Sequence, residues 1–111
     1  MYVYFLRSQG TPRRLKIGKA KNPIDRMKTL QTGCPYPITL AGAIRCKDDA
    51  HALRVERAMH AYFADNRKQG EWFRCTDYIL SQVWDLLNQL SSIDGDVHAL
   101  TADELIQLHT V

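Results

Sequence analysis

The stretch RRLKIGKAKNPIDR, which runs from Arg13 to Arg26, decides the fold because it joins a strand to a helix. A short apolar pair, Ile17 and Gly18, lies at its centre and leads to the helix start at Asn22 and Pro23. Asn22 is a good N-cap, and Pro23 suits the first turn of a helix. We therefore predict a strand over residues 15–18 and a helix over residues 23–31.

Cations surround this junction. From residue 7 to residue 28 there are eight Lys or Arg and one acid, a local net charge of +7, whereas residues 77–111 hold six acids and no Lys or Arg. Such a polarity favours a nucleic-acid partner of the amino-terminal half. The side chains expected to contact phosphates are Arg7, Arg13, Arg14, Lys19, Lys21 and Lys28.

The composition bounds the class of protein. A chain of 111 residues with 45% apolar and 24% charged residues suits one soluble domain with a single core. No apolar run approaches the ~20 residues of a membrane span, and MYVYFLRS does not resemble a secretion signal. We expect a cytoplasmic protein without a membrane partner, whose three unpaired cysteines are reduced.

The remaining elements follow from hydrophobic periodicity and turn residues. Residues 2–6 suit a strand buried on both faces, which forms a hairpin with residues 15–18. The other predicted elements are a strand over 38–46, a helix from Asp48 or Asp49 to about Ala64, a short strand or turn at Trp72 and Phe73, and a helix from Thr76 to about Leu90.

The carboxyl end is predicted to be separate from the main domain. Residues 91–96 have the composition of a linker, and Thr101 with Glu104 forms a capping box before a short apolar helix. We assign 1–91 to the domain and 92–111 to the linker and a short acidic helix. That helix is a candidate for homodimer contacts.

Glu56 and His60 stand out on the second long helix. They lie four residues apart and project into an apolar arc. The residues of that arc are Leu53, Val55, Met59, Tyr62 and Phe63. Burying a carboxylate is costly unless it faces a cation or a metal. The pattern leaves two readings open: a metal pair, or a Glu56 paired with Arg or reaching solvent beside a satisfied core histidine.

Four elements in register resemble a known family. Tyr2-Val3-Tyr4, Lys16-Ile17-Gly18, Arg26 and Glu56 have the order and spacing of the GIY-YIG nuclease superfamily. The motifs KIGKAxNPxxRxxxLQTG, VERAMHAYF and GEWF resemble more narrowly the phage T5orf172 type of DNA-associated domain. The resemblance covers about residues 2–73. It implies an α/β (α+β) fold with a three-stranded antiparallel sheet in a ββαβα core, followed by carboxy-terminal helices.

The resemblance also implies metal-dependent cleavage of a DNA phosphodiester. Glu56 would ligate Mg²⁺ or Mn²⁺, which a hard oxygen ligand suits. Arg26 would contact the scissile phosphate. Tyr4 would position the attacking water or help to deprotonate it, and His60 would support the metal ligand or transfer a proton.

One departure from the superfamily pattern bears on activity, because Lys16 stands where the second tyrosine is expected. A lysine there could serve as the base or could bind phosphate. Gly18, Trp72 and Phe73 are motif residues, and the two aromatic ones are expected to anchor the core rather than to stack on bases. Two alternatives therefore stay open: a DNA-binding module with little or no cleavage activity and, more remotely, a protein-interaction domain.

Overall fold

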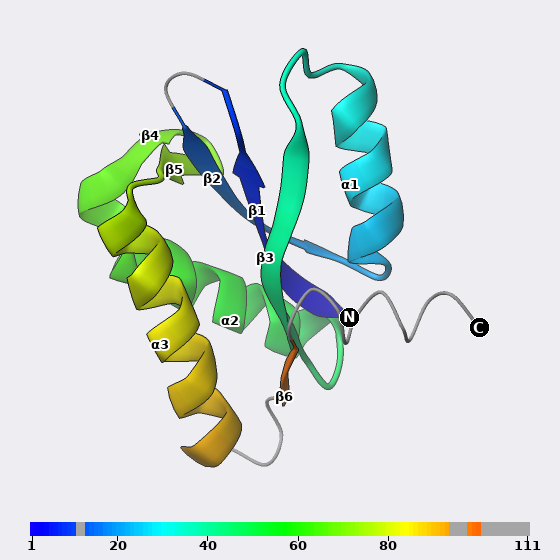
Figure 1. Ribbon diagram of the computed structural model, residues 1–111. Helices are drawn as coiled ribbons and strands as arrows, with labels where there is room; N and C mark the ends of the chain where they lie inside the picture. Colours follow the sequence, from blue (N-terminus) through cyan, green and yellow to red (C-terminus); the bar gives the residue numbers. More distant parts are fainter. Residues whose placement is uncertain (11–12, 94–97, 101–111) are drawn as a thin grey trace.

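The computed structural model describes residues 1–10, 13–93 and 98–100, and its elements are labelled in Figure 1. In chain order they are β1 (Tyr2–Ser8), β2 (Arg14–Ala20), α1 (Pro23–Thr32), β3 (Ile38–Arg45), α2 (Asp49–Tyr62), a 3₁₀ turn η1 (Ala64–Asn66), β4 (Arg67–Gln69), β5 (Trp72–Arg74), α3 (Asp77–Ile93) and β6 (His98–Leu100).

One antiparallel sheet runs through the molecule in the strand order β4-β5-β2-β1-β3-β6. The mixed α/β class is confirmed, and the three predicted strands β1, β2 and β3 form its centre. The predicted three-stranded sheet was too small, because β4 and β5 extend one edge and β6 extends the other. β5 lies where a short strand or turn was predicted, at Trp72 and Phe73. Each of these edge strands has only three residues, too few to show a two-residue periodicity in the sequence.

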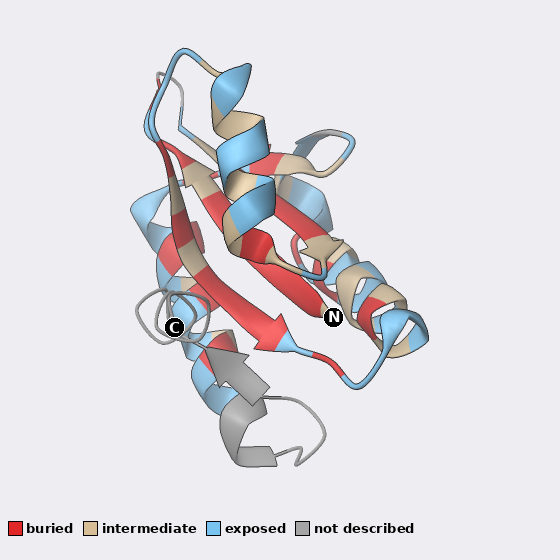
Figure 2. Ribbon diagram, turned by 90° about the vertical axis from the view of Figure 1, so that its right-hand side faces the viewer, coloured by how far each residue is buried: buried red, intermediate tan, exposed pale blue. Residues whose placement is uncertain are grey.

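Helices cover both faces of the sheet. Val3 and Phe5 of β1 face a core shared with α2 and α3, whereas Tyr4 and Leu6 face a smaller core under α1. Buried residues accordingly concentrate on the strands and exposed residues on the outer helix faces (Figure 2). Because alternate β1 side chains enter two different cores, the strand is apolar throughout.

The helices begin at the predicted caps. Asn22 Oδ1 accepts hydrogen bonds from the amides of Ile24 and Asp25, at 3.1 and 3.2 Å. Asp48, rather than Asp49, caps α2. Thr76 Oγ1 accepts a hydrogen bond from the first turn of α3 at 3.1 Å. These bonds satisfy amides that have no partner within their helix.

The ends of two helices differ from the prediction. α2 ends at Tyr62, before the expected Ala64, and α3 continues to Ile93, past the expected Leu90. Residues 91–93 therefore belong to a helix rather than to a linker. The short helix predicted from Thr101 lies outside the described residues.

The three cysteines are free thiols, as expected, and Cys46 and Cys75 are buried. Within the described ranges, no helix is both long enough and apolar enough to cross a membrane.

Candidate functional site

The candidate site lies beside the middle of β2, where the pairing with the start of β5 stops and the later part of α2 packs on β2. β5 pairs with β2 only over residues 14–16. At the next position the amide of Ile17 donates to the carbonyl of Glu71 at 3.1 Å, and the carbonyl of Ile17 lies 2.9 Å from His60 Nε2. These contacts therefore bring side chains from the start of β5 and from α2 to the middle of β2.

Gly18 creates the space in which the site is built. It pairs with Tyr4 across β1 and β2. A Cβ atom at residue 18 would lie 2.5 Å from Tyr4 Oη and 3.0 Å from Glu71 Oε2. A phenol and a carboxylate thus meet over a residue that has no side chain, and glycine is needed here for close approach rather than for an unusual backbone conformation.

Tyr4 is 1% exposed and interacts both with Arg26 of α1 and with Glu71. Burial raises the pKa of its phenol, a hydrogen bond with Arg26 of α1 lowers it, and the charges of Glu71 and Glu56 raise it, with a net increase. The phenol therefore keeps its proton at neutral pH. Because a guanidinium can only donate, the phenol oxygen accepts from Arg26, and its O–H can donate elsewhere.

Glu56 presents an oxygen that no group of the described chain satisfies. Its Oε2 is buried and has no hydrogen-bond partner among the described residues. Burial, followed by the charge of Glu71, raises the pKa of this carboxyl, against the smaller effects of His60, Lys19 and Lys16. The expected alternative of an Arg partner is not found within the described residues.

An oxygen of this kind fits a hard divalent cation, because a buried carboxylate oxygen requires a positive partner. No group of three or more His, Cys, Asp or Glu side chains converges as a metal site within the described part of the chain. Further ligands at Glu56 would therefore be water or substrate oxygens, as is common for Mg²⁺.

Lys16 is held in place by two groups. Its Nζ lies 3.0 Å from Glu71 Oε2 and 5.1 Å from the centre of the Trp72 ring, and its side chain is only 9% exposed. Phe73 is fully buried, as predicted for a core anchor, whereas Trp72 is half-buried and carries the lysine on its ring.

The sequence did not single out Glu71 as a functional residue, although it belongs to the GEWF motif. Its contact with Lys16 depends on the pairing of Lys16 with Trp72, which joins segments more than fifty residues apart. The available signal was a lysine placed in a strand that is otherwise buried, which calls for a carboxylate partner.

His60 is a satisfied histidine in this structure. A carbonyl can only accept, so the 2.9 Å contact with Ile17 requires His60 Nε2 to carry the proton. The ring also packs edge-on against Phe73, with centroids 5.2 Å apart. These contacts favour a role in fastening α2 to β2.

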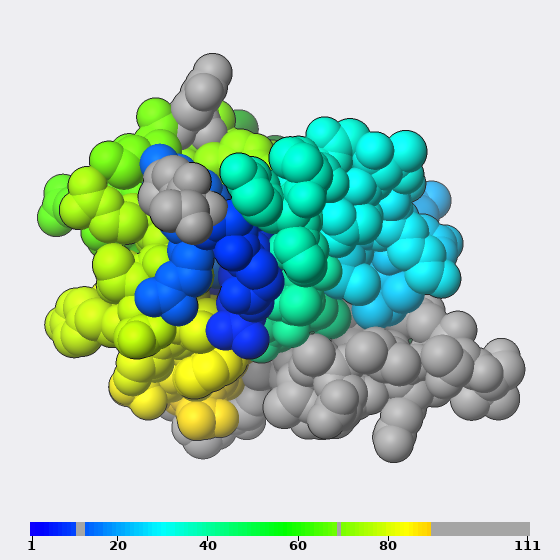
Figure 3. All heavy atoms as spheres, turned by 45° about the horizontal axis from the view of Figure 1, so that its top comes forward, coloured from blue at the N-terminus to red at the C-terminus, as the bar shows by residue number. Residues whose placement is uncertain are grey.

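The predicted phosphate-binding cations form two groups rather than one. Arg7, Arg13 and Arg14 lie near the end of β1 and the start of β2, and the hairpin that these strands form is seen beside β3 in Figure 3. Lys19, Lys21 and Lys28 lie at the other end of β2 and on α1.

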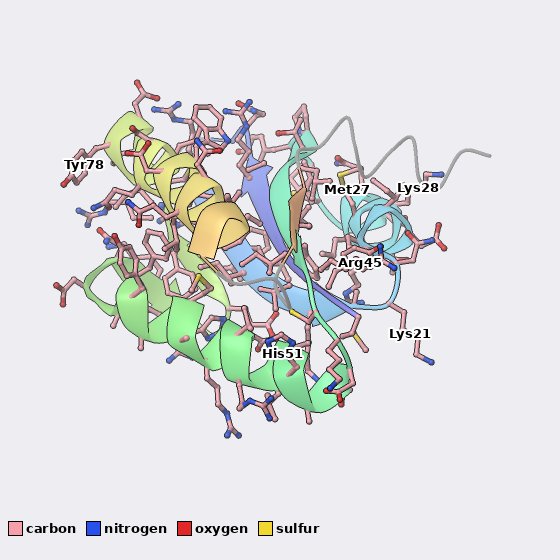
Figure 4. All side chains as sticks on the ribbon, turned by 90° about the horizontal axis from the view of Figure 1, so that it is seen from below. Lys21, Met27, Lys28, Arg45, His51 and Tyr78 are labelled. Carbon is pink, nitrogen blue, oxygen red and sulfur yellow. The ribbon has the colours of Figure 1, made fainter. Side chains whose placement is uncertain are left out.

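Several of these cations already have partners. Arg7 Nε donates to Thr39 Oγ1, Arg13 pairs with Asp77 at 3.1 Å, and Lys19 pairs with Asp49 at 2.6 Å. Lys21 and Lys28 form no ion pair with the described residues, and both point outward in Figure 4.

The fold and the site define a small mixed α/β domain with a polar, charged cluster at one sheet edge. Residues 1–91 match the T5orf172 domain, and the chain belongs to this family. No curated protein and no solved structure matches the chain significantly.

Proposed function

We propose that this protein is a divalent-metal-dependent DNA endonuclease of the GIY-YIG type, which hydrolyses or nicks a phosphodiester. The observation that carries the proposal is the buried Glu56 Oε2, which has no donor within the described chain and belongs to a carboxyl whose charge helps to raise the pKa of Tyr4. Membership in the T5orf172 family is compatible with such a role.

Each residue of the cluster has a task in this proposal. Glu56 would hold Mg²⁺ or Mn²⁺, and the cation would supply Lewis-acid stabilisation of the charge on the phosphate. Arg26 is exposed on α1 and can donate to phosphate oxygens. Tyr4 keeps its proton and can donate a hydrogen bond that orients a water molecule or the phosphate.

The second candidate function is a DNA-binding module with little or no cleavage activity. The observation that favours it is the ion pair between Lys16 and Glu71. An ammonium that donates to a carboxylate has no lone pair with which to accept a proton, so Lys16 does not replace a basic phenol.

Incubation of supercoiled plasmid with the protein separates the two functions. We expect the wild type to produce nicked DNA with Mg²⁺ or Mn²⁺ and none with EDTA. Glu56→Gln and Arg26→Ala should each lower the rate roughly 100-fold or more, since each removes a group that stabilises developing charge. Arg57→Ala, which changes an exposed helical arginine on the outer side of α2, is the matched control and should cleave normally.

If the wild type leaves the plasmid as intact as Glu56→Gln does, while both bind DNA, the endonuclease proposal fails and the binding module replaces it.

A further inference from the structure

The proposed hydrolysis requires a group that takes a proton from the attacking water, and most polar groups of the cluster are unsuited to this task. Tyr4 is protonated and accepts from Arg26. His60 uses Nε2 as a donor to a backbone carbonyl. Lys16 donates to Glu71, and the buried oxygen of Glu56 suits a cation. Among the polar groups of the cluster, the carboxylate of Glu71 is therefore the candidate for the general base.

Glu71 has the geometry of a positioned base. Its backbone carbonyl is bonded to the amide of Ile17 at 3.1 Å, and its Oε2 receives the Lys16 ammonium at 3.0 Å. The same oxygen borders the space above Gly18, as does Tyr4 Oη. The side chain is 39% exposed, so water reaches it. Both ends of the residue are thus fixed while the carboxylate remains open to solvent.

We propose that Glu71 is the general base of the reaction and that Lys16 is its positioning residue. This inference rests on the proposed endonuclease function. Water gives a proton to a Glu71 carboxylate oxygen, and the water oxygen forms a bond to phosphorus. The bond from phosphorus to the leaving sugar oxygen breaks, and that oxygen takes the electron pair and then a proton from solvent. Lys16 holds the carboxylate over Gly18 through an ion pair, which a neutral phenol at position 16 would not supply.

The decisive variant is Glu71→Gln, which keeps the shape of the side chain and removes its charge. With saturating protein and Mn²⁺, the single-turnover rate of plasmid nicking should fall roughly 10²- to 10⁴-fold, the range expected for loss of a general base. DNA affinity and Mn²⁺ affinity, the latter measured by titration calorimetry, should stay within about twofold of wild type, because a base contributes to the chemical step.

The ion pair of Lys19 with Asp49 supplies a matched control on the same strand. Asp49→Asn likewise removes the acid of a lysine–carboxylate pair and should nick at the wild-type rate at saturating DNA. A normal rate for Glu71→Gln would overturn the inference. A Mn²⁺ affinity about tenfold weaker would also overturn it, by making Glu71 a metal ligand.

Lys16→Gln tests the positioning role by comparing the chemical step with DNA binding. The single-turnover rate at saturating DNA and Mn²⁺ should fall at least about tenfold, because the Glu71 carboxylate loses the ammonium that lies 3.0 Å from it. Lys16→Arg should restore most of the rate, since a guanidinium also donates to a carboxylate. A wild-type rate for Lys16→Gln would limit Lys16 to a structural role and overturn this part of the inference.

Two outcomes need a separate test: a Glu71→Gln variant that does not fold, and a wild type that does not cleave. Should Glu71→Gln fail to fold, Glu71→Asp replaces it, and it should bind DNA normally yet nick at least about tenfold more slowly, since a displaced base is inefficient. A wild-type rate for Glu71→Asp would overturn the inference. An inactive wild type would overturn the proposed function itself, and the inference with it.

Discussion

Two glutamates at the site differ in what surrounds them. Glu71 has an ammonium at 3.0 Å, whereas Glu56 has a buried oxygen that lacks a partner within the described residues. The negative charge of Glu71 is therefore compensated in the folded protein, whereas the buried oxygen of Glu56 is not. A binding group that is left unsatisfied lowers the stability of the fold until its ligand arrives.

This difference predicts a pH-dependent effect of Glu56→Gln on stability. Because the folded protein raises the pKa of Glu56 above its ordinary value of 4.5, ionising the group costs the folded state more than the unfolded state. This destabilisation of the folded state is absent at a pH below 4.5, where Glu56 is protonated in both states, and is complete at a pH above the raised pKa of the folded state. In EDTA at pH 7, the substitution should raise the free energy of unfolding by up to about 1 kcal/mol, a small value because a partly exposed charge is screened. At pH 3 the difference should vanish.

Urea denaturation at the two pH values measures this effect. Asp48→Asn is a control of opposite sign, since the hydrogen bond from the His51 amide lowers the pKa of Asp48 and makes its charge stabilising above the ordinary pKa. A Glu56→Gln variant that is less stable than wild type at pH 7 would show that Oε2 is satisfied in solution.

At the scale of elements, the site depends on how closely β1 and β2 approach each other's side chains. β2 contributes Gly18 opposite Tyr4, so the phenol lies over the neighbouring strand, and the carboxylate of Glu71, the residue before β5, borders the same space. The β5–β2 pairing and the His60 contact hold this edge on either side of Ile17. These contacts fix the backbone of β2 and therefore the positions of the polar groups around Gly18.

Gly18→Ala should disturb the packing of Tyr4 over β2. The new Cβ would lie 2.5 Å from Tyr4 Oη and 2.7 Å from Tyr4 Cζ, and the buried ring has little room to withdraw. We expect a loss of roughly 1–3 kcal/mol in the free energy of unfolding, the usual cost of overpacking. Loss of nicking should accompany it even at temperatures where the variant is fully folded.

Gly33→Ala is the matched control, because a Cβ at this α1 C-cap meets nothing within 4 Å and the backbone has a negative φ. Its stability should be unchanged or higher by up to about 1 kcal/mol. Equal stability of the two variants in thermal and urea denaturation would mean that Tyr4 moves aside easily.

At the scale of the whole molecule, the fold divides the basic segment between two regions. Residues near the β1–β2 connection lie at one end of β2, whereas Lys21 follows the other end of β2 and Lys28 lies on α1. Arg13 is already paired with an acid of α3. Because Arg26 belongs to the α1 region, we expect DNA to rely more on that region.

The salt dependence of DNA binding tests this expectation. The slope of log K against log salt reports the number of phosphate contacts, about one per cation. Lys21→Ala combined with Lys28→Ala should reduce the slope by about 2, and Arg13→Ala combined with Arg14→Ala by about 1 or less. Fluorescence anisotropy on a short duplex gives both slopes. A larger change for the arginine pair would place the DNA at the β1–β2 connection.

Much of the fold was predictable because its signals are local. The caps at Asn22 and Thr76, the proline that opens α1 and the apolar strand β1 each act within a few residues of the chain. Of the short edge strands, β5 was expected as a short strand or turn at Trp72 and Phe73. β4 and β6 were not predicted, since a three-residue strand is stabilised by the neighbour with which it pairs. The same holds for the exact ends of α2 and α3.

By itself, the sequence determined the order of the helices and central strands, the basic character of the amino-terminal half, and the candidate residues Tyr4, Arg26 and Glu56. Only the tertiary structure decided that Lys16 is paired with Glu71, that His60 is satisfied by a backbone carbonyl, and that the cations form two groups. The physical reason is that hydrogen bonds, ion pairs and burial depend on distances between atoms that lie far apart along the chain.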